Sequence, residues 1–156
     1  MIARVLVSSC LLGADVRYHG GSARIDSEIL RRWLDEGRVV PVCPEVEGGL
    51  GTPRPPAEIV GLHVITNEGR DVTAAFQTGA ARAVALASEH GIRVAVLKSH
   101  SPSCGSSEVF DGTFSGRLVP GAGITARALA GIGVRLFDET QLAEADAALN
   151  RIDQLT

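Results

Sequence analysis

The amino-acid sequence predicts an α/β fold, a single-domain Rossmann-like or flavodoxin-like sandwich in which helices cover both faces of a mainly parallel sheet. The first observation behind this prediction is that short aliphatic runs alternate with longer segments of helical periodicity. The second is the length, because 156 residues suffice for one hydrophobic core and no internal repeat divides the sequence. The third is that three of the aliphatic runs lead into cysteine-bearing loops. We therefore expect one domain over residues 1–156, with cysteines at the carboxyl ends of its strands.

The main strands are predicted where short aliphatic runs are bounded by polar residues or glycine. They cover residues 4–9, 39–42, 94–97 and 133–137. Right-handed crossovers between parallel strands, in the strand order 2-1-3-4, place the carboxyl ends of the first three side by side. A further segment, 59–66, is typical of two short strands or of one edge strand.

The helices are predicted from apolar residues that recur at helical spacing and from the capping residues beside them. They cover residues 26–36, 73–90, a segment that follows 121–125 and ends at 130, and a segment from 138 or 139 to about 149. Asp26 or Ser27 can cap the first helix and Thr73 the second. Trp33 and Phe76 are assigned to the core because they lie on apolar positions of these helices.

Three segments contain too many glycine, proline or turn residues for regular structure. They are residues 11–22, 44–56 and 108–116, the last with an Asp-Gly turn. Long ordered loops at strand ends are usually functional. We expect the first two to wall a cleft at the edge of the sheet, together with Arg17, Arg54 and Glu58, and a buried Arg–Glu pair to organise these loops.

Charge and hydropathy exclude several classes of protein. The formal net charge of −3 argues against binding to a nucleic acid polymer, which needs a basic face. No apolar run reaches membrane-spanning length, and the first residues lack the pattern of a signal peptide. We therefore expect a cytoplasmic protein that does not act on a membrane.

The three cysteines, Cys10, Cys43 and Cys104, are the main functional signal. An odd number of cysteines in a reducing compartment is a poor disulfide framework. Three converging thiolates could instead hold an iron–sulfur cluster, or a zinc ion with His100 or His19 as a fourth ligand. They could also be three small buried hydrophobic residues, and these residue types alone leave the three alternatives open.

Polar residues beside the cysteines favour chemistry at the same edge. Glu45 follows Cys43 by two residues, and its carboxylate could serve as a general acid or base in a partly apolar cleft. Ser101 and Ser103 could donate hydroxyl hydrogen bonds, or could only satisfy backbone amides of a turn.

Three other features near the cysteines are weaker signals. Lys98 could compensate the charge of ligating thiolates, and His100 could donate a proton, although both could be surface residues. Gly121 and Gly123, which precede a helix, could bind an anion through backbone amides.

Several motifs together resemble the bacterial thiouracil desulfidase family. They are C-L-L-G at Cys10, R-Y-x-G at Arg17, V-P-V-C-P-E at Cys43, G-G-L-G-x-P-R at Gly48 and L-K-x-x-S-P-S-C-G at Leu97. Later D-V-T, F-x-G-A, D-G-T-F-S-G and G-x-G-I-T-A elements fit too, so the resemblance covers nearly the whole chain.

The resemblance implies a [4Fe-4S] cluster held by Cys10, Cys43 and Cys104, with one iron that the protein does not ligate. That iron would bind the sulfur of a thiolated pyrimidine such as 2-thiouracil, and Glu45 and Ser101 would be catalytic. The implied reaction is hydrolytic, yielding uracil and hydrogen sulfide. Such a cluster could be absent after preparation in air, and we expect a monomer or a weak dimer.

Two other functions are compatible with the residues. One is a non-catalytic iron–sulfur or zinc protein that senses redox state or stabilises a partner. The other is a nucleotide-binding flavodoxin-like module in which the cysteines are incidental.

Overall fold

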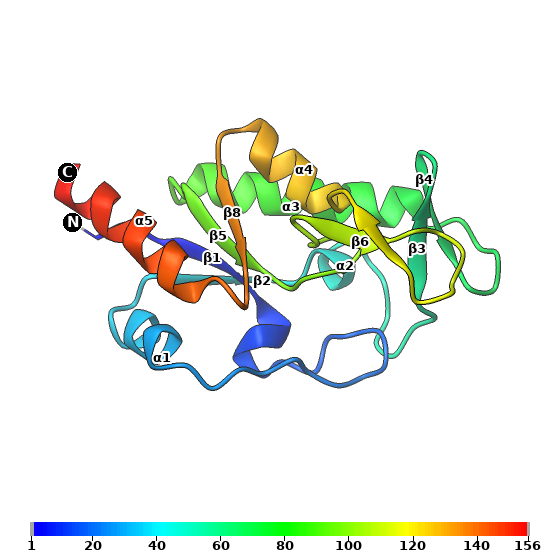
Figure 1. The fold of residues 1–156 in the computed structure, drawn as a ribbon, viewed down its shortest axis with the longest axis horizontal. Coiled ribbons are helices and arrows are strands. Elements are labelled where there is room, and N and C mark those ends of the chain that lie inside the picture. Colours follow the sequence, from blue (N-terminus) through cyan, green and yellow to red (C-terminus); the bar gives the residue numbers. More distant parts are fainter. Residues whose placement is uncertain (1, 156) are drawn as a thin grey trace.

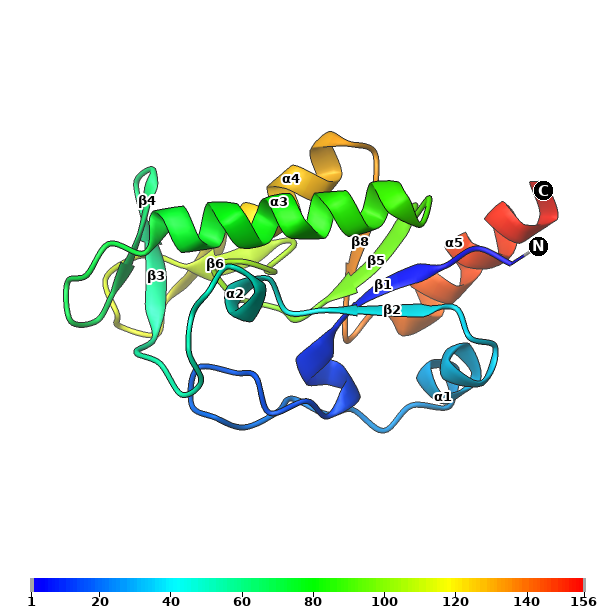
Figure 2. The ribbon, with the colours of Figure 1, turned by 180° about the vertical axis from the view of Figure 1, so that it is seen from behind.

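A four-stranded parallel sheet lies between two layers of helices in the computed structural model, which describes residues 2–155 (Figures 1 and 2). Its strands are β1 (Val5–Ser8), β2 (Val39–Val42), β5 (Val94–Leu97) and β8 (Arg135–Asp138). Their order is β2-β1-β5-β8, and each neighbouring pair is parallel. The predicted α/β sandwich and the predicted 2-1-3-4 order of its main strands are confirmed.

Helices and two hairpins complete the chain. The helical segments are η1 (Ser9–Leu12, a 3₁₀ turn), α1 (Glu28–Asp35), α2 (Pro44–Glu47), α3 (Thr73–Glu89), α4 (Ile124–Gly131) and α5 (Leu142–Leu155). The hairpins pair β3 (Ala57–Val60) with β4 (His63–Thr66), and β6 (Glu108–Phe110) with β7 (Leu118–Pro120). Within residues 2–155, no helix combines the length and apolarity needed to span a bilayer.

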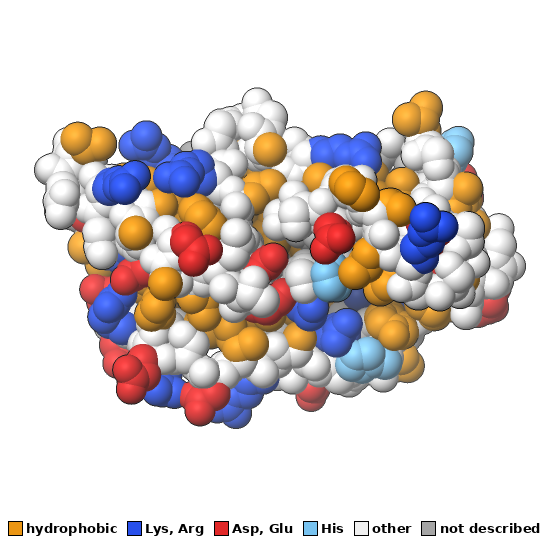
Figure 3. All heavy atoms as spheres, in the orientation of Figure 1, with side chains coloured by type: hydrophobic (Ala, Val, Ile, Leu, Met, Phe, Trp, Pro, Cys, Tyr) orange, Lys and Arg blue, Asp and Glu red, His pale blue; other side chains and the backbone are white. Residues whose placement is uncertain are grey.

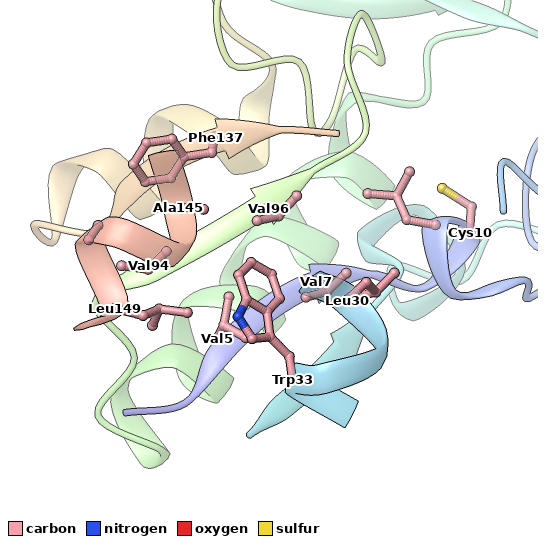
Figure 4. Close-up of a cluster of buried hydrophobic side chains, with 12 residues drawn as sticks. Val5, Val7, Cys10, Leu30, Trp33, Val94, Val96, Phe137, Ala145 and Leu149 are labelled. Atoms are coloured by element: carbon pink, nitrogen blue, oxygen red, sulfur yellow. The ribbon is translucent and has the colours of Figure 1, made fainter. Parts of the chain in front are cut away.

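One side of the sheet packs against α1 and α5 around Trp33, which is fully buried (Figure 4). Val5 and Val7 of β1 and Val94 and Val96 of β5 point into this layer, as the two-residue period of a strand requires. The indole Nε1 of Trp33 donates to an Asp146 carboxylate oxygen of α5 at 3.0 Å, so its polar atom is satisfied.

The other side packs against α3 and α4. The intervening strand residues Leu6, Ala95 and Leu97 contact alanines of α3 such as Ala83, together with Leu129 of α4. Small alanine side chains let α3 lie close to both the sheet and α4. Strands that are apolar on both faces are typical of a parallel sheet covered by helices.

The element boundaries differ from the sequence predictions in three informative ways. Residues 44–47 form the short helix α2 instead of loop, because Pro44 stands at the first helical position, where its missing N–H is not needed. The predicted irregular segment 108–116 contains β6, which finds its partner β7 only beyond the predicted turn. The last helix continues to Leu155.

Ser27 caps α1 as predicted, since its side chain accepts the Leu30 N–H.

The prediction that Thr73 caps α3 is wrong. Thr73 is the first residue of the helix, and its hydroxyl oxygen accepts the backbone N–H of Val64 at 2.8 Å. Asp71 instead accepts the Thr73 N–H at 2.9 Å. The hydroxyl of Thr73 therefore joins the helix to the β3–β4 hairpin.

Candidate functional site

A cavity of about 470 Å³ opens where β1, β2 and β5 end. The strand ends form its floor, and residues from the two hairpins and from the glycine- and proline-rich loops form its walls. Acidic, basic and histidine side chains gather in the middle of the face shown in Figure 3. Ligands bind at this edge in open α/β sheets, so the cavity is the candidate site.

All three cysteines line this cavity. Cys10 lies on η1, immediately after β1, and Figure 4 places it at one end of the buried core. Cys43 is the N-cap residue of α2, and Cys104 lies in the loop after β5. The convergence predicted from the strand order is therefore observed.

The three thiols are free, and their environment keeps them protonated while no metal is bound. Burial raises the pKa of Cys10 to about 11, and repulsion from Cys43, when that thiol is ionised, acts in the same direction, while Arg17 and Lys98 lower the pKa. Burial also raises the pKa of Cys43 and that of Cys104, the second with a contribution from Glu45. All three thiols therefore have raised pKa values at one cavity.

Glu45 stands beside these thiols on the first turn of α2 and is held from two sides. Arg54 Nε donates to Glu45 Oε1 at 3.3 Å, and the Ser101 hydroxyl donates to Glu45 Oε2 at 3.3 Å. Arg54 is itself fixed, because its guanidinium also donates to the Val16 carbonyl at 2.9 Å. The carboxylate therefore has a defined orientation in the cavity wall.

Ser101 is oriented by the loop that carries Cys104. Its oxygen accepts the backbone N–H groups of Ser103 at 3.0 Å and Cys104 at 3.2 Å. With two amides on that oxygen, the hydroxyl proton is directed to Glu45. The sequence predictions for Glu45 and Ser101 thus fall on two residues that hydrogen-bond to each other.

The position of α2 depends on two glycine contacts with α3. A Cβ atom on Gly79 would lie 1.9 Å from the Pro44 carbonyl oxygen, and one on Gly48 would lie 2.0 Å from the Ala75 carbonyl oxygen. Both distances are far below contact, so each position needs a glycine. The two helices can therefore approach closely, and this approach fixes Cys43 and Glu45 at the cavity.

The Cys104 loop is held by the first residues of α4. The backbone N–H groups of Gly123, Ile124 and Thr125 donate to carbonyls of residues 105, 102 and 103 at 2.8, 2.9 and 2.9 Å. The sequence offers the amides of Gly121 and Gly123 as a candidate anion site. In the structure the Gly121 amide donates to the Ser107 carbonyl, and the Gly123 amide is used as just described, so neither amide is left for an anion.

Ser103 also belongs to this support and not to the cavity wall. Its hydroxyl is fully buried and lies 2.7 Å from that of Thr125. The hydroxyl hydrogen bond expected of Ser103 is therefore made to Thr125, beneath Cys104.

Lys98 and His100 both line the cavity. Lys98 Nζ bonds to the carbonyl and hydroxyl oxygens of Ser99 at 3.2 and 3.1 Å and lies 3.7 Å from Glu139 Oε1. Glu139 also accepts the Ser99 backbone N–H. His100 has a positive φ of 69°, and its ring meets that of Phe110 edge to face.

The predicted buried Arg–Glu pair exists with a different partner. Arg54 pairs with Glu45, while Glu58 accepts the backbone N–H groups of Gly112 and Phe114. Arg17 lines the cavity near Cys10.

The sequence predictions missed two residues of this region, Glu139 and Phe114. An acidic residue after the last strand was a usable signal for Glu139, because that strand ends at the same edge. No sequence motif near Phe114 indicated a place at the cavity, because its position depends on the pairing of β6 with β7.

The donor set fits a metal cluster bound through sulfur. Three unpaired thiols, all buried or half-buried, surround one cavity, and thiolate is the ligand that iron–sulfur clusters use. Among residues 2–155 no group of three or more histidine, cysteine and acidic side chains is arranged to hold one metal ion. A cluster is wider than one ion, so thiols spread around a cavity suit it better than they suit the predicted alternative of zinc.

The fold and site together define an α/β protein with three converging thiols and a carboxylate–hydroxyl pair in one strand-end cavity. The chain matches the family model described as 2-thiouracil desulfurase over residues 5–141. It therefore belongs to that family, and the resemblance seen in its motifs is confirmed.

Two similar proteins agree with this membership. A solved structure described as the [4Fe-4S]-dependent thiouracil desulfidase TudS has a TM-score of 0.93 and 49% sequence identity, over 95% of this chain and 98% of that chain. The protein named "Uncharacterized protein YbbK" from Bacillus subtilis (strain 168) is 43% identical over 148 residues, which is 88% of this chain and 97% of the relative.

Proposed function

We propose that this protein is a [4Fe-4S]-dependent desulfidase that removes sulfur from a thiolated pyrimidine such as 2-thiouracil. The observation that carries the proposal is the convergence of three free thiols in one cavity beside the Glu45–Ser101 pair. The family membership and the similarity to a [4Fe-4S]-dependent thiouracil desulfidase support the cluster and the substrate class.

Cys10, Cys43 and Cys104 would hold the cluster. When bound, a cluster with three protein ligands supplies one open iron, a Lewis acid for the thiocarbonyl sulfur. Because burial raises the pKa of all three thiols, loading releases their protons, and Arg17 and Lys98 favour the resulting negative charge on Cys10. The chain thus offers both the ligands and nearby cations.

Glu45 and Ser101 would handle the protons of the reaction. Water forms the new C–O bond at the ring carbon, the C–S bond breaks, and both water protons end on the departing sulfide, so the products are uracil and hydrogen sulfide. Glu45 accepts a proton from this water, and the Ser101 hydroxyl, which points at Glu45 Oε2, passes protons between the carboxylate and the substrate. Arg54 holds the carboxylate in place at Oε1.

We further propose a small-molecule substrate, not a nucleic acid polymer, and a cytoplasmic monomer or weak dimer. The net charge of −3 and the three free cysteines support this setting. Size-exclusion chromatography with light scattering of the cluster-bearing protein tests the oligomeric state.

The test is anaerobic reconstitution with iron and sulfide, followed by an assay of sulfide release from 2-thiouracil, for the wild type and Glu45→Gln. We expect Glu45→Gln to keep the cluster absorbance and to lose roughly 10²-fold or more in turnover, the usual contribution of a general acid–base group. Glu47→Gln is the matched control, because Glu47 lies on the same helix but is exposed and pairs with Arg82.

Wild-type turnover in Glu45→Gln would remove Glu45 from the mechanism. A stable cluster with no sulfide release from any thiolated pyrimidine would instead favour the non-catalytic iron–sulfur protein.

A further inference from the structure

The loop between β6 and β7 brings a strained aromatic residue to the cavity. Phe114 has a φ of +56°, and it lines the cavity with its side chain partly exposed. The left-handed conformation is unfavourable for a residue with a Cβ atom, so glycine would be the more stable choice at this position. A backbone outlier of this kind points to a function for the side chain.

A buried carboxylate holds this loop in place. Glu58 Oε1 accepts the backbone N–H groups of Gly112 at 2.9 Å and of Phe114 at 3.2 Å. Gly112 packs directly on β3, since a Cβ there would lie 2.7 Å from the Ile59 carbonyl oxygen. Figures 1 and 2 both show the β6–β7 loop beside β3. Two hydrogen bonds and a close contact therefore fix the backbone that carries the ring.

Phe114 belongs to neither of the two hydrophobic core clusters. Two other planar side chains, Phe110 and His100, line the same cavity, and their rings meet at a centroid distance of 6.2 Å. Phe114 is 39% exposed, much more than the core aromatics Trp33 and Phe76 at 0% and 1%. An aromatic ring exposed at a cavity suits a planar ligand, since heterocyclic bases stack on aromatic side chains.

We propose that Phe114 positions the substrate by stacking on its planar heterocycle, and that Glu58 is a positioning residue that holds the Phe114 loop. The inference rests on the proposed function for the kind of ring that is bound. It adds a binding wall made by the hairpins, separate from the cysteines, Glu45 and Ser101.

The first test compares Phe114→Ala and Phe114→Tyr in the cluster-bearing protein with 2-thiouracil. Stacking acts equally on bound substrate and transition state, so Phe114→Ala should raise KM about tenfold with kcat within about twofold. Phe114→Tyr keeps the ring and should keep the wild-type KM. Leu62→Ala, an exposed apolar truncation on the neighbouring β3–β4 turn, is the control.

The second test separates the ring from the backbone. Phe114→Gly removes the strain that Phe114→Ala retains, so its melting temperature should exceed that of Phe114→Ala while both share the raised KM. Glu58→Gln keeps a carbonyl oxygen that can accept both N–H groups, and it should keep the wild-type KM. Glu58→Ala loses the acceptor and should reproduce the tenfold rise, with iron content and melting curves showing that it folds.

Direct binding of 2-thiouracil, measured by equilibrium dialysis, separates this inference from the proposed function. If the wild type binds 2-thiouracil about tenfold more tightly than Phe114→Ala, the inference is supported, whether or not sulfide is released. Binding without sulfide release would refute only the proposed desulfidase activity. A wild-type KM and binding constant in Phe114→Ala would overturn the inference while leaving the desulfidase intact. A wild type that neither binds nor converts 2-thiouracil would overturn both.

Discussion

The interior of the sandwich and the strand-end cavity use different interactions. Around Trp33 the sheet is held by aliphatic packing, with few polar groups. At the cavity, the positions of Glu45, Ser101 and Arg54 are set by hydrogen bonds to side chains and to backbone carbonyls and amides. The comparison teaches that the scaffold can tolerate changes in the site, except where the two regions share backbone contacts.

The largest effect is expected from removing a thiol. Cys43→Ser should abolish cluster incorporation, since a hydroxyl is a far poorer ligand for iron–sulfur clusters than thiolate. The melting temperature of the cluster-free variant should stay within a few degrees of the cluster-free wild type, because the half-buried Cys43 lies outside both core clusters. Iron analysis and thermal melts check this. A large loss of stability without metal would show that the thiol belongs to the scaffold.

Gly79→Ala tests the contact that joins the two regions. The added Cβ would meet the Pro44 carbonyl oxygen at 1.9 Å, so α2 must shift, and we expect a destabilisation of about 1–3 kcal/mol with reduced iron loading. Gly131→Ala is the matched control, because nothing lies within 4 Å of that position at the end of α4. It should be neutral or stabilising by up to about 1 kcal/mol. Equal effects from the two substitutions, measured by denaturant unfolding, would contradict the account.

The smallest effect concerns how the stability of the scaffold depends on pH. Burial opposes ionisation of Asp146, but hydrogen bonds from Arg32 and Trp33 outweigh it and hold the pKa of this carboxyl below its usual range. The stabilisation is therefore present above the unfolded pKa, near 4, and is lost as the pH falls through the lower folded value. Asp146→Asn should be less stable than the wild type at pH 7, and the difference should shrink below about pH 4. Unfolding at both pH values measures it, and a difference that grows in acid would refute it.

The sequence was sufficient for the sheet and for the three cysteines because both depend on local signals. Aliphatic runs define the strands, and the topology of parallel crossovers brings their ends together. Glu45 and Ser101 could be found because they lie within three residues of Cys43 and Cys104.

The remaining features depend on contacts between distant segments. Arg54 bonds to Glu45 instead of Glu58, a choice made by the fold of the loop and not by its composition. The pairing of β6 with β7 and the positive φ of Phe114 likewise have no local signature. The amides of Gly121 and Gly123 were available in the sequence but are taken by carbonyls in the fold.

The most direct test of the central claim follows the atoms of the reaction. The reconstituted protein is given 2-thiouracil in ¹⁸O-labelled water, without added oxidant or reductant, and uracil and sulfide are quantified together. The account predicts equal amounts of the two products and one labelled oxygen in each uracil. Sulfide without uracil, unlabelled uracil, or a requirement for an electron donor would contradict hydrolytic desulfuration at this cavity.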